Sequence, residues 1–186
     1  MMLDSILQAV EGYQRTKLDR QGLRPAAVLV PLYAKAGEVF LVLQVRTYKV
    51  DHHKGQISFP GGMRDPEDRD SVDTALRESY EEIGLRHYVV EVVGLLDDSL
   101  TITGFRITPV VGRIPADYEF QTNPDEVHKL LEVPWSLFFS ESNLEHGRLR
   151  HDDVMFEVDY YPYQGYQIWG ATARIIRHLV DLTKNA

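Results

Sequence analysis

The sequence predicts a single α/β (α+β) domain in which helices flank a mixed β-sheet. Two β-rich runs follow each other closely after residue 25, and segments with helical periodicity lie before them, mid-chain and at the C-terminus. The order of these segments lacks the regular strand–helix alternation that a parallel sheet requires. With 186 residues and no internal repeat or low-complexity linker, the chain suits one domain, whose core we place at about residues 26–180.

The first predicted elements are an N-terminal helix and a β-hairpin. Leu3, Ile6, Leu7 and Val10 recur at helical spacing within roughly residues 3–16. Residues 26–33 and 38–46 are rich in β-branched and apolar residues, and the Lys-Ala-Gly stretch at 35–37 indicates the turn between them.

The most informative segment is a predicted helix over residues 71–83. Asp70 or Ser71 can cap its start, and Gly84 is typical of the position after its end. One helical stripe is expected to face the core, and its members are Val72, Ala75, Leu76, Ser79 and Ile83.

Further strands are expected near residues 89–96, 106–113 and 155–160. A short helix is expected after Pro124, and a C-terminal helix over residues 171–183.

The composition is typical of a globular protein and excludes several classes. Apolar residues make up 44% and charged residues 26%, which excludes disordered and collagen-like chains. No apolar run approaches the about 20 residues of a membrane span, and the N-terminus lacks a signal-peptide pattern, so we expect a cytoplasmic protein that binds no membrane. The absence of cysteine excludes Cys-ligated metal sites.

The net charge of −8 argues against a general nucleic-acid binder, which would need a basic surface. It does not exclude a small anionic substrate, because a bound metal ion can supply the positive charge. The oligomeric state is not decided by the sequence, and a homodimer is possible.

Three glutamates crowd one face of the helix over residues 71–83. Glu78, Glu81 and Glu82 are related by i,i+3 and i,i+4 spacings, where each like-charged pair costs about 0.2–0.5 kcal/mol. They also lie near the helix C-terminus, where the macrodipole disfavours negative charge, and Arg77 relieves only part of this.

Two interpretations of this face are open. One is an ordinary solvated acidic surface, since Glu is a good helix former. The other is a site for Mg²⁺ or Mn²⁺, for which carboxylate oxygens are suitable ligands. The Gly61-Gly62 pair favours the second, because glycines let the backbone approach a ligand or present a carbonyl to a metal.

This segment resembles the signature of the Nudix hydrolases. That signature is Gly, five residues, Glu, seven residues, then Arg-Glu-apolar-any-Glu-Glu-any-Gly-apolar. The matching residues are Gly62, Arg77, Glu78, Glu81, Glu82, Gly84 and Leu85. The chain departs from the signature at Asp68, which replaces the first Glu, in the eight-residue gap that follows, and at Ser79.

The resemblance implies a Nudix-type α/β/α sandwich and hydrolysis of a diphosphate with Mg²⁺ or Mn²⁺. It implies that Glu78 and Glu82 are the main metal ligands and that Glu81 is a further ligand or positions the water. Arg77 would orient a glutamate through a salt bridge, and the Gly62 carbonyl would add a ligand.

A general base is still required, since a water molecule must lose a proton as it attacks phosphorus. The candidates are Glu126, Glu119, Asp97 and Asp98, of which we favour Glu126. The alternative for Glu126 is a structural one, a charge in the first turn of the helix expected after Pro124.

Residues 42–62 resemble the extra motif of the coenzyme A pyrophosphatase branch of the Nudix family. The matching residues are Arg46, Thr47, Gly55, Phe59, Pro60, Gly61 and Gly62. The chain departs at Gln44, where Thr is usual, and at Asp51, where a second Arg is usual.

This second resemblance implies coenzyme A or an acyl derivative as substrate. We expect Arg46, Lys54, Gly61 and Gly62 to bind it, and Arg46 and Lys54 belong to a basic cluster able to hold phosphates. The other members of that cluster are Lys49, His52 and His53. Alternatives are ADP-ribose or a dinucleotide as substrate, or a Nudix module that senses a nucleotide without cleaving it.

Overall fold

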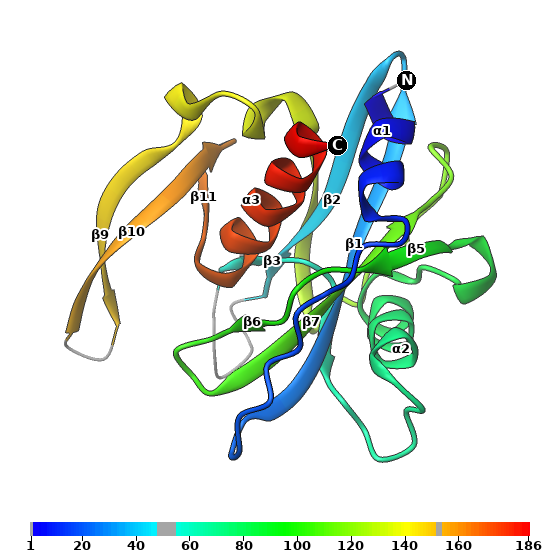
Figure 1. The fold of residues 1–186 in the computed structure, drawn as a ribbon, viewed down its shortest axis with the longest axis horizontal. Helices are drawn as coiled ribbons and strands as arrows, with labels where there is room; N and C mark the ends of the chain where they lie inside the picture. Colours follow the sequence, from blue (N-terminus) through cyan, green and yellow to red (C-terminus); the bar gives the residue numbers. More distant parts are fainter. Residues whose placement is uncertain (1, 48–54, 152–153) are drawn as a thin grey trace.

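The predicted α/β sandwich is confirmed by a computed structural model, which describes residues 2–47, 55–151 and 154–186. A mixed sheet forms the centre, with helix α2 on one face and helices α1 and α3 on the other (Figure 1). The helices are α1 (Met2–Val10), α2 (Ser71–Ile83) and α3 (Gly170–Asn185), with 3₁₀ turns at His87–Val89, Trp135–Phe138 and Glu141–Asn143.

The central sheet is mixed because one strand pair is parallel. Its strands are β1 (Arg24–Lys35), β2 (Glu38–Arg46), β3 (Ile57–Ser58), β4 (Gly61–Met63), β5 (Glu91–Leu95), β6 (Ser99–Leu100), β7 (Phe105–Arg113) and β8 (Val127–Pro134). The main order is β3-β2-β1-β7-β5, while β8 pairs with β2, β4 with β1 and β6 with β7. Strands β1 and β7 run parallel, and the other pairs are antiparallel.

A smaller antiparallel sheet lies beside α3 (Figure 1). It consists of β9 (Glu145–His151), β10 (Val154–Tyr163) and β11 (Tyr166–Trp169), in the order β11-β10-β9.

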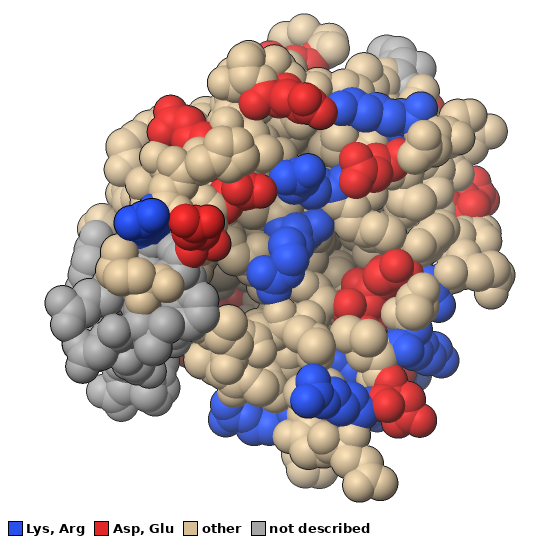
Figure 2. Space-filling view, turned by 60° about the vertical axis from the view of Figure 1, so that its left-hand side comes forward, with Lys and Arg blue, Asp and Glu red and all other residues tan. Residues whose placement is uncertain are grey.

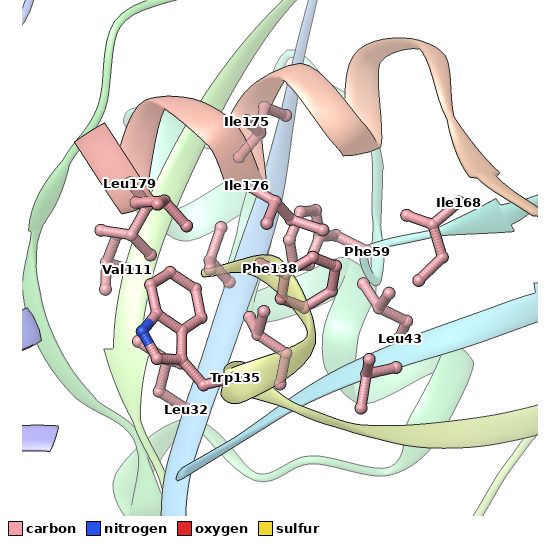
Figure 3. Close-up of a cluster of buried hydrophobic side chains, with 14 of the residues drawn as sticks. Leu32, Leu43, Phe59, Val111, Trp135, Phe138, Ile168, Ile175, Ile176 and Leu179 are labelled. Carbon is pink, nitrogen blue, oxygen red and sulfur yellow. The ribbon is translucent and has the colours of Figure 1, made fainter. Parts of the chain in front are cut away.

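Strand β1 is buried on both faces and therefore separates two cores. Val28, Val30 and Leu32 face the larger core with α1 and α3, whereas Ala27 and Leu29 face the smaller core beneath α2. In the larger core, Trp135 and Phe138 pack among side chains from α3 and the sheet (Figure 3). The buried contacts of the smaller core fix the position of α2 on the sheet.

The hairpin and the C-terminal helix form where the sequence predicts them. Ala36 and Gly37 join β1 to β2 with φ of 52° and 85°. Two positive φ values in a two-residue turn match the right-handed twist of the strands, and glycine tolerates them readily.

Two helix predictions are corrected by the structure. The N-terminal helix ends at Val10 rather than near residue 16, because Gly12 adopts φ of 75° and the chain leaves the helix there. The short helix expected directly after Pro124 is not formed, since residues 124–126 form a turn and β8 begins at Val127. Pairing with β2 and the burial of Val127, Leu131 and Val133 favour the strand.

None of the helices within the described parts of the chain has the length and apolar character that crossing a bilayer requires. On the face shown in Figure 2, acidic and basic side chains interleave, without a continuous basic stripe.

Candidate active site at the glutamate helix

Helix α2 presents its glutamates in a defined direction because both of its ends are capped. The Asp70 carboxylate accepts hydrogen bonds from the Val72 and Asp73 amides, at 2.8 and 3.0 Å. Gly84 closes the helix in the left-handed conformation, with φ of 68°. Ser79 lies in the buried stripe, where its hydroxyl donates to the Ala75 carbonyl at 2.6 Å, so the polar residue is satisfied within the helix.

Glu82 is the most buried of the three glutamates, with 2% of its surface exposed. Its Oε2 accepts from the Gln44 side-chain amide at 2.7 Å and from the Gly61 backbone amide at 2.9 Å. Arg46 lies 3.4 Å from its Oε1. Burial raises the pKa of Glu82 to about 7, although these three donors oppose the rise.

Glu78 and Glu81 are bound to one guanidinium. Nη1 of Arg77 donates to Glu78 Oε1 at 2.9 Å and to Glu81 Oε2 at 3.0 Å. Burial raises the pKa of Glu78, and the Arg77 charge opposes that rise. Glu81 is about half exposed, with 49% of its side chain accessible.

Arg77 is itself anchored by Asp68. Its Nε donates to Asp68 Oδ1 at 3.0 Å, and this hydrogen bond is the main reason that the pKa of Asp68 is lowered to about 2. Thr74 and the Asp65 amide also donate to Asp68, at 2.9 Å each. Asp68 has a shorter side chain than the Glu of the signature, and one more residue separates it from Arg77, but its carboxylate still binds the guanidinium. Arg77 is therefore held in a fixed orientation despite this departure from the signature.

Gly61 and Gly62 lie against the glutamates on strand β4. A Cβ at Gly62 would lie 2.5 Å from the Glu78 carboxylate carbon, and one at Gly61 would lie 2.4 Å from the Ala27 carbonyl oxygen. Gly61 is required by the close packing of β4 on the backbone of β1, whereas Gly62 leaves room for the Glu78 carboxylate in its present position.

Of the four general-base candidates, Glu126 is the one placed beside the glutamate helix. Its negative charge is close enough to raise the pKa of Glu78. The preceding loop is tied to α2 by a hydrogen bond of 2.8 Å from the Asn123 amide to the Glu82 carbonyl. Thr47 at the end of β2 donates its amide to the Glu126 carbonyl at 2.9 Å.

The other three candidates lie elsewhere and have other partners. Asp98 binds Arg15 at 2.7 Å, and Asp97 accepts from the hydroxyl of Tyr13 at 3.1 Å. These aspartates hold the segment after α1 against the sheet. Glu119 is an exposed residue of the loop between β7 and β8.

The expected substrate-binding residues are only partly described. Arg46 lies at the site, where its Nη1 is 3.4 Å from Glu82 and its side chain is partly exposed to solvent. Its buried Nε has no hydrogen-bond partner among the described residues. Lys54 lies outside the described residues, as do Lys49, Asp51, His52 and His53.

Gln44 is a site residue that the sequence did not indicate as one. It appears there only as a departure from a motif, within a strand of apolar residues. A fully buried amide in such a strand is the signal, because a buried polar group needs a partner and Glu82 supplies it.

The donor set fits a hard divalent cation. Among the described residues, no three His, Asp or Glu side chains already converge as metal ligands. Two of the carboxylates nevertheless share one cationic nitrogen of Arg77. The negative charges of Glu81 and Glu126 add to the rise in the pKa of Glu78, and the charge of Glu78 adds to the rise in the pKa of Glu82, so these carboxylates lie close enough to repel one another. Oxygen ligands of this kind suit Mg²⁺ or Mn²⁺.

The chain is similar to known proteins over most of its length. The family model described as NUDIX domain matches residues 23–165. NudL of Photorhabdus laumondii, described as an uncharacterised Nudix hydrolase, is 38% identical over 158 residues, which are 85% of this chain and 84% of that protein. NudL of Yersinia pestis (strain Pestoides F) is 38% identical over 158 residues, covering 85% and 79% of the two chains.

Solved structures support the fold. RenU, a Nudix hydrolase from M. smegmatis, matches with a TM-score of 0.53 and 23% identity, over 61% of this chain and 72% of that one. A MutT/nudix family protein from Enterococcus faecalis matches with a TM-score of 0.53 and 17% identity, over 89% and 63%.

Proposed function

Because this chain belongs to the Nudix family of hydrolases, which act on a diphosphate bond, we propose that its substrate is coenzyme A or an acyl-coenzyme A. The products are 3′,5′-ADP and 4′-phosphopantetheine or its acyl form, and the cofactor is Mg²⁺ or Mn²⁺. The observation that carries the hydrolytic part is the grouping of Glu78, Glu81 and Glu82 around Arg77 and the glycine pair.

We assign the roles within the site as follows. Glu78, Glu81, Glu82 and the Gly62 carbonyl would hold the divalent cation, and the cation would supply positive charge against the diphosphate and lower the pKa of a bound water. Arg77 orients Glu78 and Glu81 by its hydrogen bonds to both. Glu126 accepts the proton of the attacking water, whose oxygen bonds to phosphorus as the bond to the leaving phosphate oxygen breaks.

The choice of coenzyme A is supported by the motif around residues 42–62 and by the position of Arg46. Its Nη1 lies 3.4 Å from Glu82 Oε1, and 27% of its side chain is exposed. An arginine so placed can donate to phosphate oxygens, as the 3′-phosphate or the diphosphate of coenzyme A would require.

A substrate panel tests this choice. The protein is incubated with Mg²⁺ or Mn²⁺ and coenzyme A, an acyl-coenzyme A, 3′-dephospho-coenzyme A, ADP-ribose or a dinucleotide, and the products are identified by mass. We expect coenzyme A or its acyl form to give the highest kcat/KM. The dephospho form should lose a factor of about ten or more, since a charge-assisted hydrogen bond contributes about 1.5–3 kcal/mol.

Two variants refine the panel. Arg46→Ala should reduce the difference between coenzyme A and its dephospho form, whereas Arg148→Ala, an exposed arginine on β9, should leave it unchanged. If ADP-ribose or a dinucleotide is turned over fastest, the assignment to coenzyme A is wrong, and the diphosphate hydrolase with another substrate is the alternative that fits.

A further inference from the structure

We propose that Gln44 is a positioning residue that determines which oxygen of the Glu82 carboxylate faces the reacting groups. The proposal rests on the proposed function, in which Glu82 holds the divalent cation. It concerns a residue of β2 whose side chain contacts the site only through Glu82.

The hydrogen bonds on Glu82 are distributed unequally between its two oxygens. Oε2 accepts from Gln44 Nε2 at 2.7 Å and from the Gly61 amide at 2.9 Å. A carboxylate oxygen has two lone-pair directions, so two such donors occupy it. Among the described residues, Oε1 has the longer contact of 3.4 Å with Arg46 Nη1 and no second donor, so it is the oxygen that a ligand can reach.

The orientation of the Gln44 amide follows from the same contact. Turned by 180°, the amide would place its oxygen against the Glu82 carboxylate, where two acceptors repel each other. With Glu82 ionised, as a cation ligand must be, the amide nitrogen therefore faces it. As a consequence, the Gln44 oxygen is buried and has no hydrogen-bond partner among the described residues.

This unsatisfied oxygen argues for a role beyond packing. Gln44 is fully buried on β2, whose neighbouring residues Leu43 and Val45 are apolar and equally buried. An apolar side chain of similar length would fill the space without burying an unpaired acceptor. The reason for an amide at this position is the hydrogen bond that its nitrogen donates to Oε2 of Glu82.

Loss of the Gln44 donor should loosen the carboxylate without removing it. Gly61 alone would then hold Oε2, and the carboxylate group could turn about its terminal bond. Groups that orient a metal ligand in this way typically change metal affinity or activity by about 10–100-fold when they are replaced.

The test uses Gln44→Met, which keeps a long unbranched side chain but has no donor. We expect Mn²⁺ affinity, measured by electron paramagnetic resonance on the free protein, to fall by about tenfold or more. At saturating substrate, kcat should fall by a similar factor, while KM for the diphosphate substrate changes by less than about twofold. The thermal midpoint should shift little, since packing volume is preserved.

Ser58→Ala is the matched control. Ser58 is the cross-strand neighbour of Gln44 on β3, and its buried hydroxyl has no hydrogen-bond partner within the described chain. Because Ser58 does not contact Glu82 in any described interaction, this variant should keep the parental Mn²⁺ affinity, kcat and KM.

A folded Gln44→Met protein with parental Mn²⁺ affinity and kcat would overturn the inference. If that variant does not fold, Gln44→Asn serves instead, because its amide is one methylene shorter and cannot span the same distance to Glu82. Parental values for Gln44→Asn would overturn the inference equally. A parent protein that neither binds Mn²⁺ nor cleaves a diphosphate would overturn the proposed function itself, which is a distinguishable result.

Discussion

The three glutamates of α2 differ in their surroundings far more than in their sequence context. Glu82 is almost fully buried beneath β2 and β4, Glu78 has 17% of its side chain exposed, and Glu81 has 49%. Burial disfavours the charged form of a carboxylate, so it raises the pKa of Glu82 and of Glu78. Residues of one helix face therefore differ in how far they are removed from water.

The first prediction at this scale concerns catalysis. Glu78→Gln and Glu82→Gln should each lower kcat by at least about a hundredfold, because a neutral amide cannot hold the cation or stabilise transition-state charge. Steady-state kinetics at saturating Mg²⁺ measure the effect. Glu119→Gln, at an exposed position outside the site, should keep the parental rate. Near-parental turnover in both site variants would contradict the assignment.

The second prediction concerns the pH dependence of stability in the metal-free protein. The pKa of Glu82 is about 7 in the fold, against 4.5 for an ordinary glutamate. Between these values the native state binds more protons than the unfolded state, so the free energy of unfolding falls as pH rises. The stabilisation is complete below about pH 4.5 and is lost as pH rises through about 7.

Glu82→Gln has no ionisable group at this position, so its free energy of unfolding should not fall in the same way as pH rises. Relative to the parent, its free energy of unfolding should rise by an amount on the order of 3 kcal/mol between pH 4.5 and 8. Urea unfolding in the presence of a chelator, at several pH values, measures both proteins. Parallel curves for parent and variant would show that Glu82 does not titrate in this range.

At the scale of elements, the two adjacent glycines of strand β4 make different contacts. Gly61 packs against the backbone of β1 and donates its amide to Glu82, whereas Gly62 leaves room for the carboxylate of Glu78. The capped helix α2 and this short strand therefore define the site together. Neither element would do so alone, since the carboxylates come from one and the close backbone approach from the other.

Alanine substitution should separate the effects of these contacts. Gly61→Ala brings a Cβ to 2.4 Å from a carbonyl of β1, which cannot move aside, so we expect a loss of stability of about 2 kcal/mol or more. Gly62→Ala meets the end of the Glu78 side chain, which can move. We therefore expect a smaller loss of stability but a kcat at least about tenfold lower. Chemical denaturation and kinetics on both variants distinguish these outcomes, and equal effects on stability would contradict the distinction.

At the scale of the whole molecule, the site lies where Glu82 of α2 meets Gln44 of β2 and Gly61 of β4. Helix α2 covers one face of the central sheet, and α1 and α3 cover the opposite face (Figure 1). Cation binding at α2 should consequently stabilise the whole fold, because the ligands are brought together only in the native state. A ligand at ten times its Kd contributes about 1.4 kcal/mol in this way.

Thermal unfolding with and without Mg²⁺ measures this linkage. At ten times the Kd for Mg²⁺, the parent should gain about 3–6 °C, given the entropy of unfolding of a chain of this size. Glu81→Gln should gain less at the same Mg²⁺ concentration, since it lacks one ligand. KCl at matched ionic strength controls for screening. An equal gain in both proteins would show that Glu81 does not contribute to the site.

The sequence by itself determined the elements whose causes lie within a few residues of each other. Asp70, Gly84 and the spacing of Ala75 and Ile83 are sufficient to place α2, and the structure confirms its bounds. The turn at Ala36 and Gly37 was predictable for the same reason. Caps, turns and helical periodicity depend on neighbours along the chain, so they can be recognised without knowledge of the fold.

Tertiary structure decided what depends on partners distant in the chain. Residues after Pro124 form β8 because β2 supplies hydrogen bonds and burial, although the local pattern also suited a helix. Glu82 became a buried residue with a raised pKa because Gln44 and Gly61, 38 and 21 residues before it, close over its carboxylate. Asp98 became a structural anchor because Arg15 reaches it from 83 residues away. In each case the energy comes from contacts that form only when separate elements pack, and the spacing of residues in the sequence carries no record of them.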